Sequence, residues 1–191
     1  MVINENVLAS EKTKETISDL SLIKAARKDP RLFGELYKRY VEQVFRYTYS
    51  WIGNVHESED ITAQTFLAAF ESFEKFRQDE HFASWLFTIA RNKTMDYFRQ
   101  HKNISSIDNV VDLPDDNDPL SEVIHSEQTA AITKLIQALP EEDRELLRVR
   151  FLAEMSFPEI ARFLHRNEEA VKKSIYRLLV RLHSQLEVSN E

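Results

Sequence analysis

The fold is decided by the stretch LPEEDRELLRVRFLAEMSFPEIARFLHRNEEAVKKSIYRLLVRL, residues 139–182. Ser156 and Glu159 form the S-x-x-E pattern of a capping box, which predicts a helix that begins near Phe157. A three-residue turn follows, and its last residue, Asn167, is a good N-cap for the next helix. This order of cap, helix, turn and cap predicts a helix-turn-helix.

The second helix of this pair has a basic outer face, because no acid occurs between Ala170 and Gln185. Its predicted buried face consists of Val171, Ile175, Leu178, Leu179 and Leu182. The side chains left pointing outward are Lys172, Lys173, Tyr176 and Arg177. A major groove admits one such helix, so these four residues are candidate DNA contacts. Many basic helix faces are only solvated surfaces, and the helical pattern alone supports both interpretations about equally.

The composition of the chain favours an all-helical protein. The chain has 191 residues, of which 42% are hydrophobic and 30% charged, with only 2 Gly and 5 Pro to interrupt helices. The lack of cysteine excludes disulfides, thiolate zinc sites and cysteine nucleophiles. The six histidines lack metal-ligand spacing, and we expect no metal and no other cofactor. No apolar run approaches membrane-spanning length, and the N-terminus is polar, which predicts a cytoplasmic protein without membrane insertion.

Charge is unevenly distributed along the chain, whose net charge of −7 is unusual for a nucleic-acid binder. From Asn103 to Glu127 inclusive there are seven acids and no Lys or Arg. This stretch has no helical period and predicts a flexible acidic linker. We therefore expect an all-α fold of two small helical domains. The predicted segments are a flexible N-terminal extension (1–18), a larger domain (19–102), the linker (103–122) and a smaller domain (123–191).

The larger domain is rich in aromatic residues at helical spacing. A helix that ends at Gly53-Asn54 carries a stripe that is mostly core-facing: Phe33, Leu36, Tyr37, Tyr40, Val44, Phe45, Thr48 and Trp51. A second helix runs from about Glu57 to Phe73. In the third, residues 81–100, the predicted inner face is Phe82, Trp85, Leu86, Ile89 and Ala90, and the predicted outer face is Ser84, Thr88, Arg91, Asn92, Met95 and Arg99.

These helices resemble a known family. FASWLFTIARNKTMDYFRQ, residues 82–100, resembles the signature helix of region two in bacterial RNA polymerase sigma factors. Residues 58–77 resemble the region-two helix that precedes it, and residues 139–182 are similar to sigma region four. Because nothing between them resembles region three, the layout resembles the extracytoplasmic-function subfamily. Two motifs in the family's order are more specific than a helix-turn-helix alone.

The resemblance implies a transcription initiation factor rather than an enzyme, with core RNA polymerase and promoter DNA as partners and an anti-sigma factor as the usual regulator. Region two would bind the polymerase clamp near Asp60 and Gln64, and would open the minus-ten promoter element. The positions that match minus-ten contacts are Arg77, Thr88, Arg91, Asn92 and Arg99. Region four would read the minus-thirty-five element through Lys172, Lys173, Tyr176 and Arg177.

The chain departs from the family pattern at three places. Ala63-Gln64 stands where the family often has Gln-Glu, which removes a carboxylate from the expected polymerase contact. His165 occupies the turn position where the family usually has Gly and where φ is positive, at a cost of about 1 kcal/mol. Ser174 replaces a frequent Arg, so base preference is open at that position.

Two other functions remain open on the sequence. A stand-alone helix-turn-helix regulator would bind an operator tightly without polymerase, usually as a dimer on paired half-sites. A helical protein-interaction module would have incidental basic faces and no promoter-specific activity. Only the sigma-factor interpretation predicts that the helix at residues 81–100 matters as much as the basic C-terminal helix.

Overall fold

The computed structural model describes residues 19–77, 81–102 and 127–189, and within these ranges every regular element is helical. The elements are α1 (Asp19–Lys28), η2 (Pro30–Leu32), α2 (Phe33–Ile52), α3 (Val55–Ser72), η3 (Phe73–Lys75), α4 (Phe82–Lys102), α5 (Glu127–Gln137), α6 (Glu141–Leu147), the π-helical turn η5 (Arg148–Leu152), α7 (Phe157–Phe163) and α8 (Glu168–Ser189). The predicted all-α fold is confirmed. The predicted N-terminal extension and linker lie outside the described residues.

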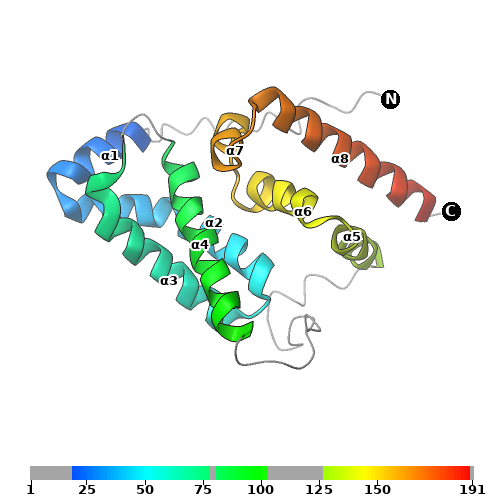
Figure 1. Ribbon diagram of the computed structural model, residues 1–191, viewed down its shortest axis with the longest axis horizontal. Coiled ribbons are helices and arrows are strands. Elements are labelled where there is room, and N and C mark those ends of the chain that lie inside the picture. The colour runs from blue at the N-terminus through cyan, green and yellow to red at the C-terminus, as the bar shows by residue number, and fades with distance from the viewer. Residues whose placement is uncertain (1–18, 78–80, 103–126, 190–191) are drawn as a thin grey trace.

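Helices α1 to α4 form the first unit, in which α3 packs against both α2 and α4 (Figure 1). Aromatic rings fill its centre, where Phe33 meets Phe73 edge-on at 5.2 Å and Phe76 meets Phe82 at 5.7 Å between ring centroids. Helix α2 ends as predicted at Gly53, whose φ of 73° is the left-handed value that glycine adopts without strain.

The predicted apolar stripe of α2 is confirmed at most positions, since Leu36, Val44 and Thr48 are fully buried. Tyr37 is an exception, because its side chain is 43% exposed while its ring edge packs on Phe66. Tyr47 was not included in the stripe and is fully buried. Tyr47 is covered by a distant part of the chain, and the helical periodicity of α2 cannot reveal such a contact.

Helices α5 to α8 form the second unit, and its local signals act as the sequence predicts. The Glu159 carboxylate accepts a hydrogen bond from the Ser156 N–H at 2.7 Å, so α7 begins with a capping box. Asn167 Oδ1 accepts from the Glu169 N–H at 2.9 Å and caps α8. Val171 and Ile175 are fully buried. The helix-turn-helix is therefore present as α7 and α8.

The turn between α7 and α8 has the strain that its sequence predicts, because His165 adopts φ of +52°. We expect His165→Gly to raise the free energy of unfolding by about 0.5–1 kcal/mol, since glycine adopts this conformation without a Cβ penalty. Thermal unfolding followed by circular dichroism measures the change. Arg162→Gly, at an exposed position within α7, is the control and should destabilise. A less stable His165→Gly protein would show that the imidazole makes a compensating contact.

The two units pack directly on each other. Helix α4 lies against α7, and α2 lies against η5 (Figure 1). The buried residues of both units belong to one continuous hydrophobic cluster, which includes Tyr47 and Phe87 from the first unit and Leu146 and Val149 from the second. The face of α4 that the sequence predicts to be solvent-exposed is therefore partly covered.

Candidate nucleic-acid interface

The outer face of α8 carries the predicted cations, but they are not equally available. Lys173, Tyr176 and Arg177 are exposed. Lys172 is half-buried, and its Nζ lies 2.8 Å from Glu168 Oε1 and 3.5 Å from Glu169 Oε1. The hydrogen bond to Glu168 raises the pKa of the Lys172 ammonium. Lys172 would have to exchange these carboxylates for phosphate, so Lys173 and Arg177 are the better placed cations for DNA.

Arg166 is a candidate contact that the sequence pattern did not single out. Its backbone N–H bonds to the Ala161 carbonyl at 2.9 Å, which fixes the residue after the left-handed turn. Its Nη2 donates to Ser174 Oγ on α8 at 2.9 Å, and both residues are at the surface. The turn thereby places a guanidinium beside α8, next to Ser174. The sequence signal that could have identified Arg166 is its position directly after a turn residue with positive φ.

Helix α4 presents only part of its predicted outer face. Thr88, Asn92 and Arg99 are exposed, as expected, and Arg99 pairs with Asp96 at 3.1 Å. The prediction was wrong for Ser84, which is 7% exposed because α7 covers it, and whose Oγ donates to the Glu159 carbonyl at 2.8 Å. Arg91 keeps an exposed edge but turns toward the second unit.

Arg77 is exposed and follows η3 by two residues. Residues 78–80, which follow it, lie outside the described residues, and His81 is exposed. Of the residues predicted to contact the minus-ten element, Thr88, Asn92 and Arg99 are thus exposed together on α4.

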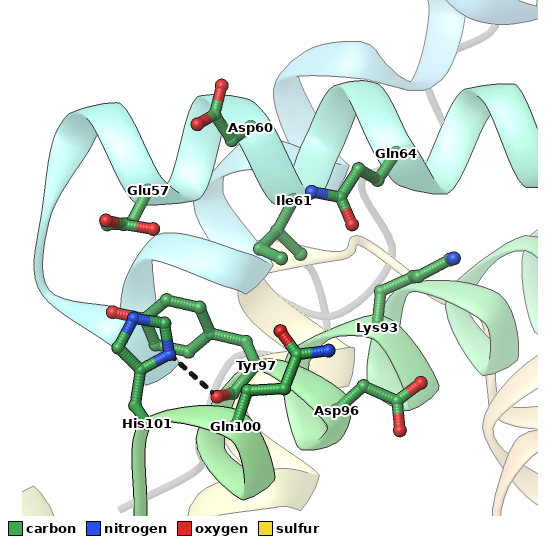
Figure 2. Close-up of a pocket in the computed structure, with 9 residues that line it drawn as sticks. All are labelled: Glu57, Asp60, Ile61, Gln64, Lys93, Asp96, Tyr97, Gln100 and His101. Carbon is green, nitrogen blue, oxygen red and sulfur yellow. Dashed lines mark hydrogen bonds between the residues drawn. The ribbon is translucent and has the colours of Figure 1, made fainter. Parts of the chain in front are cut away.

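A third surface lies on α3, where Asp60 and Gln64 are exposed one turn apart. They line a pocket of about 200 Å³ between α3 and α4, which Lys93, Asp96 and Tyr97 also line (Figure 2). Leu67, one turn beyond Gln64 on the same face, is 59% exposed. The Asp60 carboxylate disfavours contact with DNA phosphates, and the exposed Leu67 side chain offers apolar area to a protein partner.

Within the described residues, no three His, Asp or Glu side chains gather as a metal site would require. Of the helices in these residues, none combines the length and apolarity that crossing a membrane needs.

Comparison with known proteins assigns the two units separately. The family model described as Sigma-70 region 2 matches residues 36–104, and the one described as Sigma-70, region 4 matches residues 129–182. The ECF RNA polymerase sigma factor BldN of Streptomyces coelicolor is 34% identical over 76% of this chain and 56% of its own length. The ECF RNA polymerase sigma factor SigW of Bacillus subtilis is 29% identical over 86% of this chain and 94% of its own length. The chain thus spans little more than half of BldN and nearly all of SigW.

Two solved structures share the fold. CnrH, in complex with the cytosolic domain of CnrY, aligns with a TM-score of 0.64 at 24% identity and covers 89% of this chain and 97% of its own. The sigma factor RpoE of Bartonella quintana, in complex with the anti-sigma factor NepR, aligns with a TM-score of 0.58 at 20% identity and covers 82% and 97%. At these identities the similarity establishes the arrangement of the helices.

Proposed function

The chain belongs to the Sigma-70 family of transcription initiation factors, in the ECF subfamily, and we propose that it binds core RNA polymerase and directs it to a specific set of promoters. The observation that supports this proposal is that candidate DNA contacts are exposed on two separate helices, α4 and α8, and that a third exposed surface lies on α3. A stand-alone regulator would need only α8.

The proposed division of work follows the two matched regions. The region 2 unit, residues 19–102, would bind polymerase through Asp60 and Gln64 and would open the minus-ten element with Arg77, Thr88, Arg91, Asn92 and Arg99. The region 4 unit, residues 123–191, would read the minus-thirty-five element through Lys172, Lys173, Tyr176 and Arg177. Opened duplex exposes bases for capture on a protein surface, and a major groove accepts the basic face of α8.

The net charge of −7 supports a protein that binds DNA weakly by itself. Two weak contacts held on one polymerase act at a high effective concentration, so their combined affinity exceeds either one alone. We propose that the protein works in the cytoplasm, carries out no catalytic reaction of its own and needs no cofactor. RpoE of Bartonella quintana was solved with an anti-sigma factor, and we propose that a protein of this kind also regulates this chain.

In vitro transcription tests the proposal. Purified bacterial core RNA polymerase is given a genomic promoter library with and without the protein, and transcripts are mapped. We expect defined start sites only when the protein is added. Tight operator binding by the free protein, with no effect on core polymerase, would instead support the stand-alone regulator.

Arg166 provides a residue-level prediction for region 4. We expect Arg166→Ala to lower promoter affinity of the polymerase complex by about 5- to 10-fold and to reduce the salt slope of binding by about 1, because one phosphate-contacting cation is lost. Fluorescence anisotropy at several salt concentrations measures both values. Ser174→Ala is the matched control, since it removes the hydroxyl and keeps the guanidinium. Equal effects of the two substitutions would mean that the hydrogen bond orders α8 and that Arg166 does not contact DNA.

A further inference from the structure

Within the described residues, positive φ occurs at two residues other than glycine. They are Glu154, at +54°, and His165, at +52°. Both values lie in the left-handed region, which is unfavourable for a residue that has a Cβ. Strain of this kind persists where another interaction compensates for it, either inside the protein or with a partner. The two residues differ in which of these compensations they have.

Glu154 has a compensating contact inside the protein, because its Oε1 accepts a hydrogen bond from Arg46 Nη2 at 3.0 Å. His165 has none in the described part of the chain, where its imidazole is exposed and takes part in no hydrogen bond, ion pair or ring contact. Its backbone N–H donates to the Arg162 carbonyl at 3.2 Å, which holds the turn but does not involve the side chain. The imidazole is therefore available to a partner outside the protein.

Arg166 follows directly, and its side chain is held in a defined position. Its backbone N–H donates to the Ala161 carbonyl at 2.9 Å, and its Nη2 donates to Ser174 Oγ at 2.9 Å. A guanidinium has five N–H donors, so the bond to Ser174 leaves others for a second acceptor. The turn thus presents an imidazole and a positioned guanidinium from adjacent, exposed positions of the chain.

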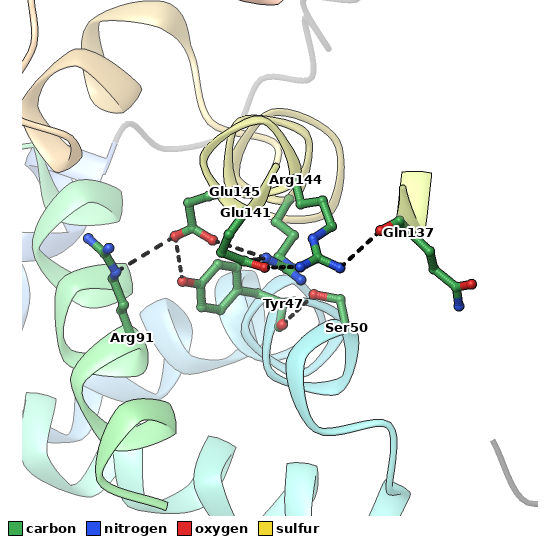
Figure 3. Close-up of polar contacts among 8 residues, drawn as sticks. Tyr47, Ser50, Arg91, Gln137, Glu141, Arg144 and Glu145 are labelled. Carbon is green, nitrogen blue, oxygen red and sulfur yellow. Dashed lines mark hydrogen bonds and ion pairs between the residues drawn. The ribbon is translucent and has the colours of Figure 1, made fainter. Parts of the chain in front are cut away.

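Other cations of the second unit are engaged by acids. Arg144 pairs with Glu141 at 2.6 Å (Figure 3), and Arg181 pairs with Asp143 at 2.5 Å. In contrast, three cations of the turn and of the outer face of α8 pair with no acid of the described residues: Arg166, Lys173 and Arg177. These two surfaces therefore carry positive charge that can be offered to an anionic partner.

The position of the turn relative to DNA follows from how α8 would bind. The chain rises roughly 10 Å along α8 from Arg166 to Lys173, and a major groove is about 12 Å wide. A helix that brings Lys173 to the base edges therefore places the residues before its first turn at the edge of the groove. The groups at that edge are the phosphates of the sugar–phosphate backbone.

We propose, on the basis of the sigma-factor function above, that the turn between α7 and α8 is a phosphate-binding element, in which His165 and Arg166 each bind a backbone phosphate beside the groove that α8 reads. The imidazole N–H and the guanidinium donate to the phosphate oxygens. Because the ligand is a phosphodiester, this element contributes affinity and fixes the position of α8 but reads no base. The left-handed His165 thus lowers the stability of the free protein and raises its affinity for DNA.

His165→Gly separates these two properties. We expect it to raise the thermal midpoint of unfolding, and to weaken promoter binding by the polymerase complex by about 3- to 5-fold, because a hydrogen bond to a charged phosphate is lost. A residue that only strained the turn would show the first effect without the second. His165→Asn is the matched variant, since asparagine tolerates positive φ and keeps a side-chain N–H donor, and it should lose less affinity than the glycine variant.

A measurement on the DNA side locates the contacts. A methylphosphonate replaces one charged phosphate oxygen by a methyl group, and a series of promoters carries it at each phosphate of the minus-thirty-five element in turn. With wild-type protein, we expect a loss of about 5-fold or more at the contacted phosphates. His165→Gly should abolish the loss at one of them and Arg166→Ala at another, while the losses at all other phosphates remain. Lys24→Ala, which removes an exposed cation from α1, is the control and should keep the whole profile.

The outcomes distinguish this proposal from the function on which it rests. A wild-type protein that binds no promoter together with core polymerase would overturn the sigma-factor function and the phosphate-binding element with it. Normal promoter binding with the same methylphosphonate profile for wild type, His165→Gly and Arg166→Ala would overturn the phosphate-binding element alone. Unchanged promoter affinity of His165→Gly, or a lower thermal midpoint, would equally contradict the role proposed for the imidazole.

Discussion

Replacing Lys173 and Arg177 together with alanine is expected to weaken promoter binding by the polymerase complex by at least about 30-fold. Both cations lie on the exposed face of α8 and are the ones not engaged by the acids of its first turn. A good bidentate contact to a base edge contributes about 1–3 kcal/mol, so two lost contacts amount to about 2 kcal/mol or more, and every 1.4 kcal/mol is tenfold. Lys172 is a weaker choice because Glu168 and Glu169 must first release it.

The measurement compares polymerase reconstituted with each variant on a promoter and on the same promoter with a scrambled minus-thirty-five element. Lys24→Ala with Lys28→Ala removes two exposed cations from α1 and is the charge-matched control. We expect the α8 variant to lose affinity only for the intact promoter. An equal loss on both templates would reduce the role of α8 to general attraction for phosphates, and an unchanged affinity would rule out this face as the contact surface.

The helix-turn-helix could be predicted from the sequence because its determinants are local. The Ser156–Glu159 capping box and the Asn167 cap are contacts between residues two or three positions apart, and their backbone donors are satisfied whatever the rest of the chain does. The positive φ of His165 follows from the same local geometry. These local features were sufficient to predict α7 and α8, and therefore also the outer face of α8.

The interface between the units could not be predicted in this way. Helical periodicity identifies which face is apolar, but it does not identify what covers a polar face. Ser84 was assigned to solvent and is covered by a segment 75 residues later in the chain. Glu145 belongs to an acidic run that is typical of a solvated first turn, yet it is buried against Tyr47, 98 positions earlier. Both side chains are buried by long-range contacts, and these contacts separate the list of candidate DNA contacts from the subset that the packing of the two units leaves exposed.

The surface on α3 gives the second large prediction, which concerns polymerase rather than DNA. We expect Asp60→Arg to weaken binding to core RNA polymerase by at least 30-fold. The Asp60 carboxylate is exposed, so its loss has little effect on the fold, and the neighbouring Gln64 carries no charge that could replace it. Removing one partner of a hydrogen-bonded charge pair that becomes buried in an interface costs about 2–5 kcal/mol, and the introduced cation adds repulsion.

Competition against a labelled wild-type protein for limiting core enzyme measures this affinity in the absence of DNA, which separates the α3 surface from the α4 and α8 surfaces. Glu35→Arg, a charge reversal of the same size at an exposed position of α2, is the control and should bind as the wild type does. Because Gln64 stands where the family often has a carboxylate, we expect Asp60 to contribute more to the interface here than it would beside a Gln-Glu pair. An Asp60→Arg protein that binds core enzyme normally would move the polymerase contact away from the first half of α3, toward exposed Leu67 and Phe70, where Leu67→Ala would then have to show the loss.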